Sequence, residues 1–244
     1  MNLLPILRSF CFDLIVYPLS FVYMFFCMPI IGLIPLATGL HLFRVCMHFI
    51  LWTLQKIVGL DYRIVGRSFL DQALQQGPCI LACKHQSVWE TIIIPTLMKD
   101  FTIVLKKELS RIPLFGYCLK KLKMIFIDRQ SGSQAVKYLL IQSRQAVKEG
   151  RSVIIFPEGT RTVLGQKSAY QVGVALLYQD LKIPVVPIAL NSGKFWGRRS
   201  IYKKPGCVTF EFLPPIEPGL SRQEFMQRLE SAIETACHRL NTSI

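Results

Sequence analysis

The hydrophobic pattern of this chain changes near residue 60. Residues 14–43 contain no Asp, Glu, Lys or Arg, and this uncharged length is sufficient to span a bilayer. Pro18, Pro29 and Pro35 interrupt the stretch, and Gly32 lies between the last two prolines. We therefore predict two membrane-associated helices, at 10–28 and 36–58, joined between the last two prolines.

Beyond residue 60, short apolar runs alternate with amphipathic stretches. The runs have the length and β-branched content of strands and lie at 60–65, 79–83, 101–105, 124–127, 153–156, 185–190 and 208–212. Helical spacing is present at 87–99, 133–149, 168–180 and 221–240. This alternation predicts an α/β fold, with a mostly parallel sheet of about seven strands flanked by helices. We expect a membrane-anchoring segment at 1–58 and one α/β domain at 59–244, with its chemistry in the loops that leave the strands.

Charge separates the same two parts of the chain. Arg8 and Asp13 are the only charged residues up to Phe43, so the whole formal charge of +14 lies on residues 44–244. A neutral apolar front followed by a basic domain fits a protein that contacts anionic lipids or anionic substrates, although nucleic acid is another partner for a basic surface. Because Arg44 and Lys56 flank the second helix, the positive-inside rule places the domain in the cytosol.

The first motif with chemical potential is Lys84-His85-Gln86-Ser87-Val88-Trp89-Glu90, directly after a predicted strand. In one regular helix His85 and Glu90 would point about 140° apart. They can meet if His85 lies in the loop and Glu90 in the first turn of the next helix, with Ser87 as its N-cap. A carboxylate that orients a histidine makes a general base, but Ser87 and Glu90 alone would also form a capping box.

Two further motifs follow predicted strands. Phe156-Pro157-Glu158-Gly159-Thr160-Arg161 offers a glycine that permits close backbone approach and an arginine suited to phosphate, although an ordinary turn would look similar. Arg129 follows Ile127-Asp128 and could reach the same anion, whereas Lys106 is a weaker candidate because surface lysines are usually solvated. The sequence has no G-x-S-x-G motif, which would supply a nucleophilic serine. The histidine would therefore activate a hydroxyl of the substrate, and the reaction would proceed by direct transfer, without a covalent enzyme intermediate.

The histidines and cysteines lack the spacing of metal ligands, so we predict no metal. Basic and aromatic residues alternate over 194–204, a pattern that suits a lipid headgroup layer, the phosphates of a carrier, or stacking on nucleic acid. The apolar front end favours the membrane or the carrier.

Taken together, these motifs resemble the 1-acyl-sn-glycerol-3-phosphate acyltransferase family, also called lysophosphatidic acid acyltransferases. The family pattern is a His, four intervening residues and then an Asp, followed by a strand ending in Arg, an F-P-E-G-T-R block, and an apolar strand containing Pro. The chain matches this order over roughly residues 60–215, with Pro187 in the last strand. It departs from the pattern at Glu90, where Asp is commonest, but a rotamer change lets the longer carboxylate reach the imidazole.

The resemblance implies a role for each matching residue. His85 would be the general base and Glu90 would orient it. Glu158, Gly159, Thr160 and Arg161 would help bind the acceptor, and Arg161 and Arg129 would hold its phosphate. Pro187 would shape the side that receives the acyl donor. The expected reaction moves a fatty acyl group from acyl-CoA or acyl-carrier protein to 1-acyl-glycerol-3-phosphate and gives phosphatidic acid, with no metal or organic cofactor.

Other readings remain open at the level of sequence. The same chemistry could act on glycerol 3-phosphate, a lysophospholipid or a lyso-aminolipid. A non-catalytic lipid-binding protein would keep the basic face and the anchor but have no use for His85. A nucleic-acid-binding module would explain the charge but not the anchor or the strand-end motifs. We therefore expect a membrane enzyme, at the inner membrane if the source is bacterial, with membrane lipids and no nucleic acid as partners.

Overall fold

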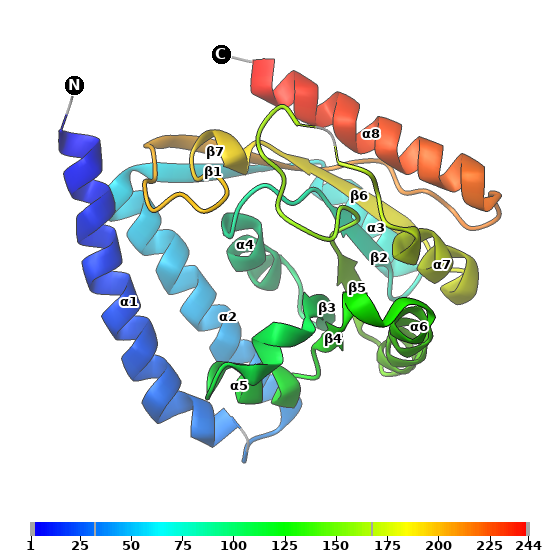
Figure 1. The fold of residues 1–244 in the computed structure, drawn as a ribbon, viewed down its shortest axis with the longest axis horizontal. Coiled ribbons are helices and arrows are strands. Elements are labelled where there is room, and N and C mark those ends of the chain that lie inside the picture. Colours follow the sequence, from blue (N-terminus) through cyan, green and yellow to red (C-terminus); the bar gives the residue numbers. More distant parts are fainter. Residues whose placement is uncertain (1–2, 32, 167, 243–244) are drawn as a thin grey trace.

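The computed structural model describes residues 3–31, 33–166 and 168–242 (Figure 1). Gly32, inside the predicted break between the first two helices, falls outside the described residues, as do two residues at each end of the chain. The strands are β1 (Leu60–Val65), β2 (Ile80–Cys83), β3 (Phe101–Lys106), β4 (Ile125–Ile127), β5 (Ser152–Ile155), β6 (Val185–Leu190) and β7 (Gly206–Phe212). The α-helices are α1 (Leu4–Ile31), α2 (Leu36–Thr53), α3 (Arg67–Gln75), α4 (Trp89–Leu97), α5 (Phe115–Lys121), α6 (Gly132–Lys148), α7 (Val172–Leu181) and α8 (Arg222–Thr242).

The described strands form one seven-stranded sheet in the order β1-β7-β6-β2-β5-β3-β4. Neighbouring strands run parallel except β6 and β7, which are antiparallel. The predicted α/β fold with a mostly parallel sheet is confirmed. Because β2, β3, β4, β5 and β6 point the same way, the loops that follow them converge at one edge of the sheet.

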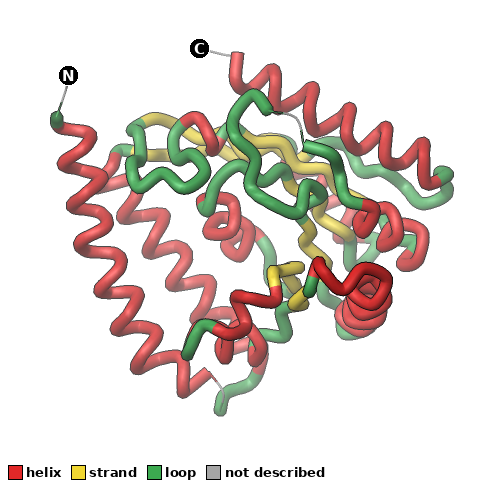
Figure 2. The backbone as a smooth tube through the Cα atoms, in the orientation of Figure 1, coloured by secondary structure: helices red, strands yellow, loops and turns green. Residues whose placement is uncertain are grey.

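Helices cover both faces of the sheet (Figures 1 and 2). Alternate residues of β2 separate the two cores. Leu81 and Cys83 pack in the core that includes residues of α1, α2 and α4, whereas Ile80 and Ala82 pack in the core built with α6, α7 and α8. Every residue of β2, β5 and β6 is buried, as expected of central strands covered on both sides.

Helices α1 and α2 present large apolar side chains to the exterior. Two segments in the described part of the chain, Leu4–Tyr23 and Leu36–Val58, are long and apolar enough to cross a membrane. Phe10, Leu14 and Phe21 on α1 are each more than 60% exposed, which would be unfavourable in water. This exposed apolar surface indicates membrane association.

A buried lysine joins α1 to the segment after β6. The Lys203 side chain is fully buried, with Nζ 5.0 Å from the ring centre of Phe12 and 4.9 Å from that of Trp196. Its ammonium pairs with Asp13 of α1, and its backbone N–H donates to Ser9 Oγ at 3.0 Å. Desolvation lowers the pKa of Lys203, against the opposing effect of Asp13. The helix α1 and the segment 195–205 therefore form one packed unit.

Several helices differ in extent or type from the predicted ones. Helix α1 includes Pro18, as predicted, but it is longer at both ends than the predicted 10–28. The second helix reaches Val58 as predicted, but its last turn is a π-helix (Leu54–Val58) that ends at Gly59 with φ +76°. Helix α7 begins at Val172 instead of 168, because the preceding residues continue the loop after β5.

Candidate active site

His85 and Glu90 meet where strand β2 ends. The strand ends at Cys83, His85 lies in the following loop, and Glu90 lies in the first turn of α4. The Nδ1 atom of His85 is 2.8 Å from Oε1 of Glu90. The loop thus brings together two side chains that a continuous helix would hold apart.

The helix that carries Glu90 begins two residues later than predicted. Val88, and not Ser87, is the N-cap, and it makes no side-chain cap. Ser87 still stabilises the turn, because its Oγ accepts the Trp89 N–H at 3.2 Å and its own N–H donates to Glu90 Oε1 at 2.7 Å. Glu90 therefore satisfies backbone donors of the turn and contacts His85 at the same time.

The carboxylate of Glu90 is completely buried and fully hydrogen-bonded. Its Oε1 accepts the N–H of Gln86 at 2.7 Å in addition to the bonds from Ser87 and His85. Its Oε2 accepts the hydroxyl of Ser192 at 2.8 Å. Because a carboxylate only accepts, the His85 proton is assigned to Nδ1, which leaves Nε2 with a free lone pair.

The imidazole is fixed in orientation but still accessible. It stacks on Phe156 with ring centres 4.1 Å apart and an interplanar angle of 24°. The His85 side chain keeps 14% of its surface exposed, and no described residue forms a hydrogen bond with Nε2. An oriented imidazole with a free Nε2 can act as a general base.

Glu158 joins the loop after β5 to the loop of His85. Its buried carboxylate accepts the backbone N–H of His85 at 2.9 Å and the Thr162 hydroxyl at 2.9 Å. The N–H of Thr162 in turn donates to the backbone oxygen of His85 at 2.8 Å. Glu158 is thus committed to the protein interior, and its carboxylate supports the histidine loop.

Lys84 completes this buried network. Its Nζ lies 2.7 Å from Glu158 and 2.6 Å from Glu234 of α8, which also accepts the hydroxyl of Tyr170 at 2.9 Å. Desolvation alone would lower the pKa of Lys84, but the hydrogen bonds and charges of Glu158 and Glu234 outweigh it and raise that pKa. The ammonium stays charged and ties the histidine loop to α8.

Gly159 and Arg129 lie against each other although they follow different strands. Gly159 is buried with φ +69°, and a Cβ there would lie 3.4 Å from Nη1 of Arg129 and 3.3 Å from the Gln171 side chain. Arg129 pairs with no described carboxylate, and desolvation lowers its pKa while the charge of Glu108 opposes the change. The Arg129 guanidinium is therefore available to an anion near the turn at Gly159, which we call the glycine turn.

Thr160 and Arg161 continue this turn toward the histidine. Both are half-buried, and no described residue forms a hydrogen bond or ion pair with the Arg161 side chain. Arg161 precedes Thr162, whose backbone contacts that of His85. The structure thus places Arg161 next to the residue that bonds to the His85 loop, and the guanidinium of Arg129 against Gly159 of the same turn.

Two other sequence candidates lie apart from this group. Lys106 is exposed at the end of β3 and pairs in register with Ile127, and no contact in the described residues links it to His85. Pro187 is buried inside β6 opposite Ala82, and its carbonyl accepts the N–H of Leu213 at 2.9 Å. The structure does not bring either side chain into contact with the His85–Glu90 pair.

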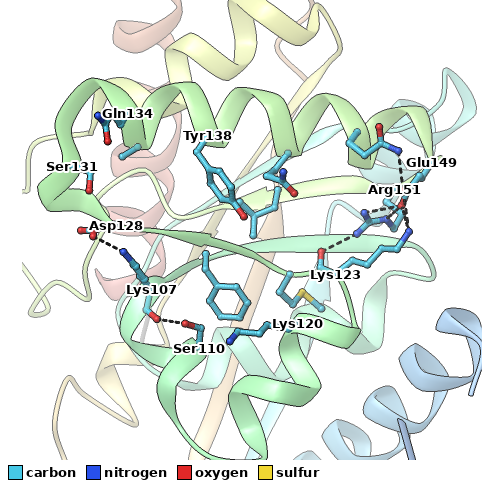
Figure 3. Close-up of a pocket in the computed structure, with 16 residues that line it drawn as sticks. Lys107, Ser110, Lys120, Lys123, Asp128, Ser131, Gln134, Tyr138, Glu149 and Arg151 are labelled. Atoms are coloured by element: carbon cyan, nitrogen blue, oxygen red, sulfur yellow. Dashed lines mark hydrogen bonds and ion pairs between the residues drawn. The ribbon is translucent and has the colours of Figure 1, made fainter. Parts of the chain in front are cut away.

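A groove of about 810 Å³ runs along the free edge of β4 (Figure 3). Helix α6 forms one wall, from which Tyr138 projects, and the opposite side carries Ser110 and Lys120. At one end Lys107 pairs with Asp128, at 3.0 Å, next to Arg129. His85 and Glu90 do not line this groove, so the residues that carry chemistry lie outside it.

Sequence analysis missed Ser192 and the role of Lys84. Ser192 follows the predicted strand 185–190, at the sheet edge where the loop of His85 also lies. A short polar residue two positions after a buried strand was a usable signal, but Ser192 and Glu90 are 102 positions apart in the sequence and only the strand order brings them together.

Comparison with known proteins places this site in a family. The pattern that defines the acyltransferase family matches residues 65–191, more than half of the chain. A 1-acyl-sn-glycerol-3-phosphate acyltransferase of Pseudomonas aeruginosa is 36% identical over 161 residues, which cover 66% of this chain and 61% of that protein. One from Cocos nucifera is 31% identical over 67% of this chain and 52% of its own length.

The chain thus spans only 61% and 52% of the lengths of these two curated relatives. Among solved structures, the 1-acyl-sn-glycerophosphate acyltransferase PlsC of Thermotoga maritima has the same fold, with a TM-score of 0.80 at 18% identity over 98% of this chain and 99% of that one. The matched residues contain the His85 loop, the glycine turn and strand β6. The chain belongs to the acyltransferase family.

Proposed function

We propose that this protein transfers a fatty acyl group from acyl-CoA or acyl-carrier protein to the free hydroxyl of 1-acyl-glycerol-3-phosphate, giving phosphatidic acid. The observation that carries the proposal is the 2.8 Å contact between His85 Nδ1 and the buried Glu90 carboxylate. Family membership, and relatives that bear the name of this activity, support the substrate class.

In the proposed reaction His85 acts on the acceptor. Its free Nε2 removes the hydroxyl proton as the acceptor oxygen attacks the thioester carbonyl, and a new C–O bond forms as the C–S bond breaks. The imidazolium then returns the proton to the departing thiolate. Glu90 holds the ring in one tautomer and offsets the positive charge that develops on it. No acyl-enzyme forms, and no metal or organic cofactor takes part.

Arg161 and Arg129 hold the acceptor phosphate in this proposal. Their guanidinium groups have no described carboxylate partner, and an arginine fork matches a phosphate in two places. Gly159 and Thr160 form the turn that lets the phosphate approach, and Glu158 shapes that turn from behind through its bonds to the His85 loop. With its phosphate held by the arginines and its hydroxyl beside His85, the acceptor would be positioned for attack on the thioester. Such positioning would supply much of the rate acceleration.

Helices α1 and α2 would attach the protein to a membrane in the proposed function. Exposed apolar residues of α1 and α2 would hold the catalytic domain at the lipid surface, where both acyl chains reside. The basic domain would face the cytosol and, in a bacterium, the inner membrane would carry the enzyme. Pro187, inside β6, would shape the side that receives the acyl donor, and Lys106, exposed at the end of β3, would be a weaker contact for the acceptor anion.

A direct transfer assay tests the proposal. The full chain, purified in detergent, is incubated with labelled acyl-CoA or acyl-carrier protein and a panel of lysolipids and glycerol 3-phosphate. We expect labelled phosphatidic acid, and its loss in His85→Ala. His238→Ala, an exposed histidine of α8, is the matched control and should keep full activity. Transfer to no acceptor, or undiminished transfer by His85→Ala, would contradict the proposal.

A further inference from the structure

Ser192 contacts the candidate active site from a distant part of the sequence. It opens the short helical turn η4 (Ser192–Lys194), two residues after the end of strand β6. The side chain is fully buried, and its hydroxyl donates to Oε2 of Glu90 at 2.8 Å. The next residue, Gly193, donates its N–H to Oε1 of Gln86 at 3.0 Å. The turn therefore docks on the loop of His85 at two points.

The two oxygens of Glu90 are held in different ways. Oε1 takes three N–H donors, all from the His85 loop, whereas Ser192 is the donor to Oε2 among the described residues. The terminal torsion of a glutamate is soft, so bonds to one oxygen alone leave the carboxylate plane free to tilt. A second fixed point on Oε2 keeps Oε1 directed at Nδ1 of His85.

Ser192 is itself held rigidly by its surroundings. Its carbonyl accepts the N–H groups of Phe195 and Trp196, at 3.0 and 2.8 Å. The preceding Asn191 accepts the N–H of Thr209 in β7 at 2.9 Å and donates to the Leu240 carbonyl of α8 at 3.3 Å. The backbone that carries the hydroxyl is thus anchored to β7 and to α8 as well as to the loop of His85.

We infer that Ser192 is a positioning residue for acyl transfer, which holds Glu90 so that the carboxylate orients His85. This inference rests on the proposed function. The serine is not a nucleophile, because it is buried and donates to the carboxylate oxygen that is not bonded to the imidazole. Its effect passes through Glu90 and reaches the proton transfer at Nε2.

Steady-state kinetics of Ser192→Ala tests this role. We expect kcat to fall about tenfold, the factor for one lost hydrogen bond to a charged group, with both KM values within about twofold of wild type. Ser192→Cys keeps a weak donor and should give a smaller loss. The matched control is Ser143→Ala on α6, which removes a buried hydroxyl that has no partner in the described residues. It should leave kcat and both KM values at their wild-type levels.

A double-mutant cycle distinguishes positioning from a general structural effect. If Ser192 acts through the Glu90 charge, Ser192→Ala in a Glu90→Gln background should lower kcat less than twofold further. An equal tenfold loss in both backgrounds, or a wild-type kcat in Ser192→Ala, would overturn the inference. An inactive wild-type protein would instead count against the proposed function.

A spectroscopic measurement tests the inference without activity. The His85 Nδ1 proton, bonded to a buried carboxylate, should give a far-downfield signal in the NMR spectrum of the full chain in detergent. Ser192→Ala should move this signal upfield or broaden it through faster exchange with water, and Ser143→Ala should leave it in place. An unchanged signal in a folded Ser192→Ala protein would also overturn the inference.

Discussion

Replacing Glu90 by glutamine isolates the effect of a single charge. The amide oxygen can accept the three N–H donors that now reach Oε1, and the Ser192 hydroxyl can rotate to accept from the new amide. Size and hydrogen-bond number are therefore retained, and the turn that begins α4 should remain. What disappears is the negative charge beside the imidazole.

The expected loss of rate follows from the geometry. When His85 takes up the acceptor proton, its ring becomes positive with Nδ1 2.8 Å from the carboxylate oxygen. Two unit charges with centres about 4 Å apart interact by about 4 kcal/mol at an effective dielectric constant of about 20. That energy corresponds to a factor of about 10³, within the range of about 10²–10⁴ for general-base catalysis. We expect kcat of Glu90→Gln to fall by about 10²–10³.

The assay is the initial rate of labelled phosphatidic acid formation at saturating donor and acceptor. Thermal unfolding should show Glu90→Gln within a few degrees of wild type, so that a lower rate reports chemistry and not misfolding. Glu230→Gln, which removes an exposed charge from α8, should keep the wild-type rate. A Glu90→Gln enzyme with full activity would refute the orienting role and leave Glu90 as a capping residue.

Three other substitutions test the turn and the fold. Gly159→Ala should lower the free energy of unfolding by about 1 kcal/mol, because its backbone is left-handed, and should raise the acceptor KM several-fold. The control is Gly165→Ala, where φ is +79° and no described atom lies within 4 Å of the added Cβ. It should lower the free energy of unfolding in urea titrations and leave the acceptor KM unchanged. Arg161→Lys should raise the acceptor KM about tenfold with little change in kcat, and an unchanged KM would argue against phosphate binding there. The pKa of Glu149 is lowered to about 2 by the Gln145 side chain and neighbouring basic groups, so its stabilising effect is complete above about pH 4.5 and is lost as the pH falls toward 2. Glu149→Gln should flatten that part of the curve of unfolding midpoint against pH, and an unchanged curve would exclude the effect.

The strands were predictable because burial on both sides leaves a strong signal. All seven apolar runs became strands, within two residues at each end. Helix α3 (Arg67–Gln75) was missed because it buries only Leu70 and Ala73, too few apolar positions to define a period. The predicted first helix already included Pro18, but its end at 28 was too early, because α1 continues through Pro29 to Ile31.

The site was predictable where sequence neighbours form it. The spacing of His85 and Glu90, read across a strand-to-helix loop, was enough to expect their contact. The bond from Ser192 needed the order of β2 and β6 in the sheet, which the pattern of apolar residues does not encode. Likewise, nothing local to Glu158 indicates that Lys84 would take up its carboxylate in the interior.

The buried Lys203 has a consequence for how this protein can be divided into fragments. The helix α1 supplies its counter-ion, Asp13, and one of its two aromatic neighbours, while the segment that carries Lys203 starts at Ser192. Deleting the first helix to obtain a water-soluble fragment would leave the Lys203 ammonium unpaired in an apolar environment and loosen the polypeptide that reaches the Glu90 carboxylate. Inactivity of such a fragment would therefore report damage to the proposed site as much as separation from the bilayer.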